Sequence, residues 1–147
     1  MAVSGIEAAK RACQASGWKL SNLALQKILY LAHMMHLGRD GERLITDDFE
    51  AWDYGPVIPS VYRQVNAFGG GPVQNVFHGV ADIEGTQEAA LIDEAVNKLA
   101  DLPPSKLVAA THRSGGAWEK SYEPGGPPSN VIPREVIKTE YETVWHE

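Results

Sequence analysis

Two histidines and two aspartates of this chain could form a metal site. His33 and His36 lie three residues apart in a stretch with helical character, and Asp47 and Asp48 follow downstream. Residues three apart share one side of a helix, so both imidazoles could bind one metal ion. The stretch is largely apolar and contains no HExxH pattern, which favours structural histidines. A small metal-dependent hydrolase using these residues is therefore the alternative hypothesis.

Other reactive residue types lack the partners that nucleophilic or phosphate chemistry needs. Cys13, the single cysteine, would need a base such as His112 or His78, and its place on an apolar helix stripe is typical of a core residue. Ser60 and Ser114 lack the context of a nucleophile elbow. The glycines at 68–73 are not followed by the Lys-Ser/Thr pair of a phosphate-binding loop. We therefore expect no enzymatic activity and no cofactor.

Composition indicates a soluble globular protein. Apolar residues make up 44% and charged residues 22% of the 147 residues, a length that suits one domain over residues 1–147. With one cysteine and no apolar signal segment at the start, we expect a reducing, cytoplasmic setting. The apolar stretch 23–37 is too short and too often interrupted by polar residues to span a bilayer. We expect no membrane partner.

The charge balance argues against nucleic acid as a partner. Thirteen basic and 19 acidic residues give a formal charge of −6, and no window holds a Lys/Arg cluster. A duplex-binding surface needs such a cluster to replace counterions on the phosphates. A DNA-binding regulator is therefore disfavoured, whereas an acidic protein suits a basic protein partner.

Helical periodicity and caps predict a mainly α domain of about six helices. Ser21 or Asn22 is expected to cap the central helix and Gly38 to end it, Pro59 to begin another, and Thr86 to cap the next. The short segment 117–121 is expected to form one turn at most. The expected helices cover residues 4–16, 21–38, 59–69, 87–101, 105–116 and a last segment that runs from Pro133 to Trp145.

The remaining segments are predicted to be extended or irregular. A short strand or hairpin is expected around 43–46 and 49–53, although Asp47 could equally cap a helical turn there. Residues 69–85 lack helical periodicity and predict a loop with at most one edge strand. Segment 122–130 is too rich in proline and glycine to be regular.

The stretch FEAWDYGPVIPSVY at 49–62 combines aromatic residues with a rigid backbone. It can be a structural corner, in which Gly55 permits the turn and the aromatic side chains fill the core. It can also be a docking surface, because rigid aromatic residues lose little entropy on binding. We expect both roles, with Trp52 buried and Tyr54 and Val57 at the rim. The candidate partner-binding residues are Trp52, Tyr54, Gly55, Pro56, Val57, Pro59 and Tyr62.

Four motifs follow one another along the chain in a recognisable order. They are Leu25 to Lys27 and Tyr30; Phe49 to Trp52, Tyr54 to Val57, Pro59 and Tyr62; Thr111, His112 and Trp118; and Ile132, Pro133 and Ile137. In this order they resemble the Panacea-domain antitoxin family, also described as SocA-like or phage-associated GepA-like proteins, over about residues 20–140. Where family members often carry a run like YAQGWH, this chain has LAHMMH, with Met34 and Met35 replacing glycine and tryptophan.

This resemblance implies a bacterial antitoxin that neutralises a co-encoded toxin by direct binding. It also implies, for some members, an adaptor that delivers the toxin to a AAA+ protease such as ClpXP. An adaptor needs a second surface, for which the N-terminal MAVSGIEA and the C-terminal TVWHE are candidates. If the LAHMMH run contacts the partner, the two methionines imply a different partner preference.

Overall fold

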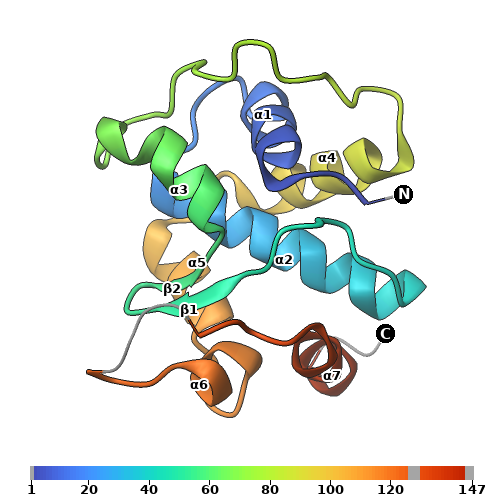
Figure 1. Ribbon diagram of the computed structural model, residues 1–147, viewed down its shortest axis with the longest axis vertical. Helices are drawn as coiled ribbons and strands as arrows, with labels where there is room; N and C mark the ends of the chain where they lie inside the picture. Colours follow the sequence, from blue (N-terminus) through green and yellow to red (C-terminus); the bar gives the residue numbers. More distant parts are fainter. Residues whose placement is uncertain (1, 126–129, 145–147) are drawn as a thin grey trace.

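The computed structural model describes residues 2–125 and 130–144 and confirms a mainly α architecture (Figure 1). A long central helix is surrounded by the other helices, with one small two-stranded sheet beside it. Over the described residues the elements are α1 (Gly5–Ala15), α2 (Asn22–Asp40), β1 (Glu50–Trp52), β2 (Gly55–Val57), α3 (Pro59–Val65), the 3-10 turn η1 (Asn66–Phe68), α4 (Gln87–Leu99), α5 (Pro104–Thr111), α6 (Ala117–Ser121) and α7 (Arg134–Val144).

Helix α2 forms the axis of the core and contacts every other helix except α6 to a substantial degree. Ser21 caps it by accepting a hydrogen bond from the Ala24 amide at 3.2 Å, as predicted. The expected stop at Gly38 is wrong, because the helix continues to Asp40 and ends at the left-handed Gly41. A Cβ on Gly38 would overlap the ring of Tyr141, so this glycine allows α7 to pack closely on α2.

Helices α1 and α4 cover one side of α2, and both were predicted from the sequence. Thr86 caps α4 by accepting from the Ala89 amide at 3.0 Å. Arg11 of α1 forms two 2.8 Å hydrogen bonds with the carboxylate of Asp93 of α4. Cys13 is fully buried on α1, and burial raises the pKa of its thiol to about 12, which confirms a core role.

The expected hairpin exists, but it lies further along the chain than predicted. Strands β1 and β2 pair antiparallel with Glu50 opposite Val57 and Trp52 opposite Gly55, so Asp53 and Tyr54 form the turn. The earlier segment contributes only a single parallel bridge between Ile45 and Val3. Asp47 starts no helical turn of its own. Its carboxylate accepts hydrogen bonds from the Gly5 amide at 2.7 Å and the Ser60 hydroxyl at 2.9 Å.

Two further segments match the sequence-based expectation in outline. Pro59 is the first residue of α3, which gives way to η1 at Asn66. The loop after η1 forms no strand of its own, and it is anchored by buried Val73, Phe77 and Ile83. The Val73 amide also donates to the carbonyl of Leu20 at 2.8 Å.

The last third of the chain adds three helices. Helix α5 begins at Pro104 and ends at Thr111, earlier than the expected 116, and α6 is the single short turn predicted at 117–121. The expected role of Trp145 in the last helix lies outside the described residues, as do residues 126–129 of the segment predicted to be irregular. None of the described helices is long and apolar enough to cross a bilayer.

Candidate functional site

The hairpin turn presents the most exposed aromatic side chain of the described residues. Tyr54 is 76% exposed at the tip. Trp52 and Tyr62 lie half-buried beside it, with ring centroids 5.0 Å apart in an edge-to-face arrangement. Such pairs contribute about 1 kcal/mol beyond their buried area. An exposed tyrosine is thus displayed next to a well-packed aromatic pair, and we call residues 50–57 the aromatic hairpin.

Helix α6 supports the aromatic hairpin through a stack of three rings. His112 stacks on Trp118 with centroids 4.0 Å apart, and Trp118 stacks on Tyr122 at 4.5 Å. The Trp118 indole donates to the carbonyl of Trp52 at 2.8 Å, and the Tyr122 hydroxyl donates to Asp53 at 2.6 Å. The end of β1 and the first residue of the turn are therefore fixed by hydrogen bonds from α6 and from its C-cap residue, Tyr122.

Helix α2 holds the other side of the aromatic hairpin with a buried glutamine. Gln26 is 3% exposed. Its side-chain oxygen accepts from the Ile58 amide at 2.8 Å, and its side-chain nitrogen donates to the Ile58 carbonyl at 3.3 Å. An unpaired buried amide costs about 1–3 kcal/mol, and Gln26 provides the partner of the Ile58 amide. Gln26 shares the Ile58 carbonyl with the Tyr62 amide, which donates to it at 3.0 Å.

The next residue of α2, Lys27, reaches the hairpin turn itself. Its ammonium is completely buried and donates to the carbonyl of Tyr54, and burial lowers the pKa of Lys27 to about 8. Gly55 follows with φ of 114°, a conformation that favours glycine. A Cβ at Gly55 would overlap the Lys27 nitrogen and lie 2.8 Å from His112 Nε2, so both the turn and the close approach require glycine.

A third stretch of chain completes the pairing of β1. The Ala51 amide donates to the carbonyl of Asn130 at 2.8 Å, and the Ile132 amide donates to the carbonyl of Phe49 at 2.8 Å. The Asn130 side chain in turn donates to the carbonyl of Ser121 at the end of α6. The aromatic hairpin is thereby held by α2, by α6 and by the segment that leads into α7.

The predicted binding residues divide into exposed and buried groups. Tyr54 is at the surface, and Trp52 and Tyr62 are half-buried. The expectation that Val57 lies at the rim is wrong, because it is 6% exposed and faces the core. Gly55 and Pro56 are also buried, and Pro59 is half-buried at the start of α3. These four residues shape the backbone that displays the aromatic rings.

Sequence reasoning did not assign Gln26, Lys27, His112, Trp118 or Tyr122 to this site. The first two looked like polar interruptions of an apolar helix, and their partners are distant in sequence. The four-residue spacing of Trp118 and Tyr122 was an available signal, since residues four apart stack on one side of a helix turn.

The candidate metal ligands do not converge. His33 is 2% exposed, its Nδ1 accepts from the Ile45 amide at 3.3 Å, and burial lowers its pKa to about 3. The ring of His36 bonds the carbonyl of Glu42 at 2.7 Å, and Asp48 pairs with Arg43 at 2.6 Å. Across residues 2–125 and 130–144, no three histidine, cysteine or acidic side chains gather as a metal site. The structural interpretation of the histidines fits these contacts, and the hydrolase hypothesis finds no support.

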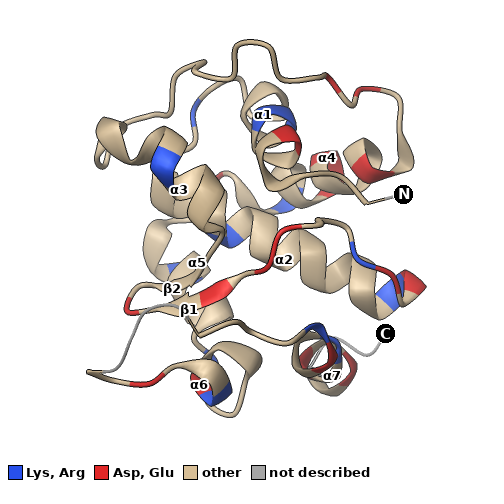
Figure 2. Cartoon of the chain, in the orientation of Figure 1, with Lys and Arg blue, Asp and Glu red and all other residues tan. Residues whose placement is uncertain are grey.

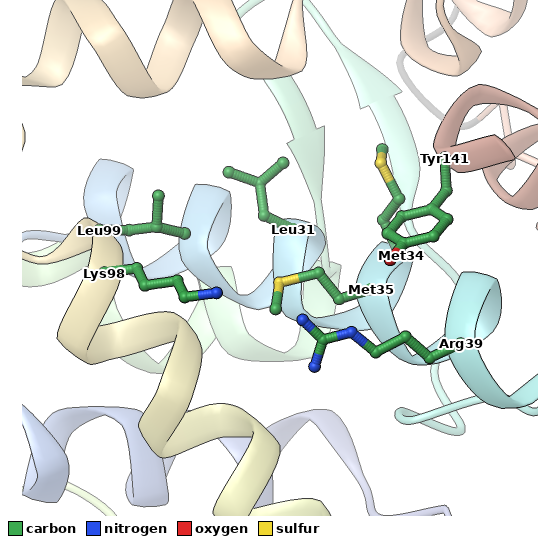
Figure 3. A pocket seen from close by; sticks show the side chains of 7 residues that line it. All are labelled: Leu31, Met34, Met35, Arg39, Lys98, Leu99 and Tyr141. Atoms are coloured by element: carbon green, nitrogen blue, oxygen red, sulfur yellow. The ribbon is translucent and has the colours of Figure 1, made fainter. Parts of the chain in front are cut away.

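The two methionines that depart from the family pattern line a groove between α2, α4 and α7. Figure 3 shows their side chains beside Leu31, with Arg39 and Lys98 at the edge and Tyr141 opposite. The groove has a volume of about 510 Å³. Met34 is 1% exposed and forms part of its floor, whereas Met35 is half-buried. Arg39 and Lys98 both pair with Glu94, at 2.9 and 3.0 Å.

The buried lysine makes stability depend on pH. Lys27 titrates near pH 8 in the folded protein and near 10.5 when unfolded, so the unfolded state binds more protons between these values. We expect the free energy of unfolding to rise by up to about 3 kcal/mol relative to a Lys27→Met variant as the pH increases through this window. Urea unfolding of both proteins at several pH values measures the difference, in which the titrations of Cys13 and Tyr30 cancel. If the free energy of unfolding changed with pH in the same way in both proteins, the lowered pKa of the buried Lys27 would be contradicted.

Comparison with known proteins identifies the family. Residues 25–119, which include most of α2, the aromatic hairpin and the first three residues of α6, match the family model described as antitoxin SocA-like, Panacea domain. Antitoxin SocA of Caulobacter vibrioides (strain NA1000 / CB15N) is 37% identical over 110 residues, which cover 68% of this chain and 58% of that protein. The match thus spans somewhat more than half the length of this curated relative. No solved structure matches the chain. With the family model covering well over half of its residues, the chain belongs to the family of SocA-like antitoxins with a Panacea domain.

Proposed function

We propose that this protein is a non-enzymatic antitoxin that binds and neutralises a co-encoded toxin protein. Family membership and the 37% identity to a protein named as an antitoxin support this role. The surface that we propose for toxin binding is the aromatic hairpin. It is held rigidly by hydrogen bonds, and Tyr54 is exposed at its tip. In this proposal the toxin is bound by that surface and no bond is made or broken.

The aromatic hairpin has the properties of a binding hot spot. Tyrosine and tryptophan dominate the binding energy of many protein interfaces, and ordering them on docking costs little when they are already fixed. Trp52 and Tyr62 are packed against each other, and Trp118 is held by its indole hydrogen bond. We therefore assign direct contact to Tyr54, Trp52 and Tyr62. Gly55, Pro56, Val57 and Pro59 act by shaping the backbone.

The charge around the hairpin favours a basic toxin. Figure 2 shows acidic residues on β1 and at the turn between β1 and β2. These are Glu50, which accepts from the Trp52 indole at 3.0 Å, and Asp53, which accepts from Tyr122. Together with the formal charge of −6, they would speed the encounter with a positively charged partner. In this proposal, association weakens as the salt concentration rises.

Truncation of Tyr54 tests the surface. We expect Tyr54→Ala to weaken binding to the product of the neighbouring reading frame at least about tenfold, because a hot-spot aromatic residue contributes roughly 2 kcal/mol. Titration calorimetry gives the affinity, and growth on co-expression gives the neutralisation. Leu102→Ala is the matched control, since Leu102 is also an exposed apolar residue, at 39%, in the turn after α4.

Both variants are expected to unfold at the same urea concentration as the wild type, because neither side chain is part of the core. Equal affinities of Tyr54→Ala and wild type would remove the hairpin from the interface. A neighbouring product that is harmless, or that does not bind the wild-type chain, would remove the antitoxin role itself.

We also propose that the protein delivers its toxin to a AAA+ protease such as ClpXP. The family resemblance supports this adaptor role. It requires a second contact surface besides the aromatic hairpin. The candidate ends 1–8 and 143–147 lie partly outside the described residues. We expect the toxin to disappear faster after inhibition of protein synthesis when this chain is present, and only in cells with an active protease. A toxin whose lifetime is the same with and without the protease would indicate neutralisation by sequestration.

A further inference from the structure

A stack of three rings ends at the surface beside the hairpin turn. Its members are His112, Trp118 and Tyr122, and the Tyr122 ring lies 4.5 Å from the Trp118 ring with 17° between the two planes. Within residues 2–125 and 130–144, no other ring and no lysine or arginine stacks on Tyr122. One flat side of the Tyr122 ring is therefore covered by Trp118, and the other side has no aromatic or cationic neighbour in that part of the chain.

A carboxylate is fixed at the edge of the Tyr122 ring. Asp53 is exposed at the first position of the hairpin turn, and its Oδ1 accepts a hydrogen bond from the Tyr122 hydroxyl at 2.6 Å. No described residue pairs with Asp53 Oδ2, and the buried Lys27 donates to the Tyr54 carbonyl. Both oxygens of an ionised carboxylate accept hydrogen bonds, so Asp53 can bind a second donor without losing its bond to Tyr122.

The charge around Asp53 selects a cationic ligand. Figure 2 shows acidic residues at the turn between β1 and β2 and in the segment that follows α6. Besides Asp53 these include Glu123, which is exposed, and Glu50 lies on β1. Neither glutamate forms an ion pair within the part of the chain that the structure describes. A phosphate or carboxylate group would be repelled here, and a neutral ring would leave Asp53 without a charged partner.

We propose that Asp53 and Tyr122 bind an arginine side chain of the toxin, with its guanidinium group paired with Asp53 Oδ2 and stacked on the uncovered side of the Tyr122 ring. This inference rests on the proposed antitoxin role and names the group that the toxin presents. A guanidinium group is planar, so it can stack on an aromatic ring while it donates hydrogen bonds to a carboxylate in its own plane. A lysine ammonium is a compact, strongly hydrated point charge that matches only the carboxylate.

The arginine site is continuous with the surface already assigned to toxin contact. Asp53 directly precedes Tyr54, which is 76% exposed. Trp118, on which Tyr122 stacks, also donates to the carbonyl of Trp52 at 2.8 Å. One toxin surface can therefore contact Tyr54 and place an arginine on Tyr122. Because the ring and the carboxylate are already fixed by their hydrogen bond, little ordering is needed when the arginine docks.

Titration with blocked amino acids tests the site without the toxin. We expect N-acetyl-arginine amide to shift the ring signals of Tyr122 and the amide signal of Asp53 in nuclear magnetic resonance spectra, with half-saturation between about 10 and 100 mM. N-acetyl-lysine amide has the same charge and should bind at least about threefold more weakly, because it cannot stack. Equal binding of the two compounds would overturn the proposal, as would the absence of saturable shifts with the arginine compound.

The variant Asp53→Asn links the site to the toxin. It keeps an oxygen for the Tyr122 hydroxyl and removes the charge. We expect it to abolish the preference for the arginine compound and to weaken binding to the neighbouring gene product about tenfold in calorimetry. Asp101→Asn is the matched control, because it changes the net charge equally at an exposed position in the turn after α4, and it should leave both affinities unchanged.

Replacing each toxin arginine by lysine in turn identifies the docking residue. One replacement should weaken binding about tenfold, and its effect should largely disappear when the antitoxin already carries Asp53→Asn. A toxin that Asp53→Asn binds and neutralises as well as the wild type would overturn the inference and leave the antitoxin role intact. Selective arginine binding by a chain that binds no neighbouring product would contradict the antitoxin role and support the arginine site. The comparison of the two blocked amino acids on the wild type decides the matter even if Asp53→Asn failed to fold.

Discussion

The hydrogen bonds from Gln26 and Lys27 of α2 to the backbone around the hairpin turn are the constraint on which the rest of the structure depends. They place two strongly polar side chains inside the core, at a cost that is offset because each one forms hydrogen bonds with buried backbone groups. The same contacts decide where the hairpin turns, why Gly55 is a glycine, and where α3 begins.

This constraint links the core to the proposed interface. Hydrogen bonds from α2 and from α6 fix the aromatic hairpin. The backbone that displays the exposed Tyr54 therefore loses little conformational entropy on binding. A two-stranded hairpin alone is marginally stable in water. A rigid support therefore explains how so short a sheet can serve as a binding element.

Local signals in the sequence predicted the helices well and the tertiary contacts poorly. Ser21, Pro59 and Thr86 begin helices as expected, because caps and prolines act through neighbouring atoms. Gly38 looked like a helix stop, but its small size serves the packing of Tyr141 from a helix about a hundred residues later. Lys27 and Gln26 looked like polar interruptions of an apolar stretch for the same reason: their partners become neighbours only after folding.

The most direct test of this account is the hydrogen exchange of the Ile58 amide, which donates to the buried Gln26 side chain, in the free protein. If the hairpin is fixed to α2, this amide exchanges only when the whole protein unfolds, at the same free energy as the Leu29 amide in the middle of α2. Exchange of Ile58 many times faster than that of Leu29 would show that the hairpin opens independently. A pre-organised docking surface would then be ruled out.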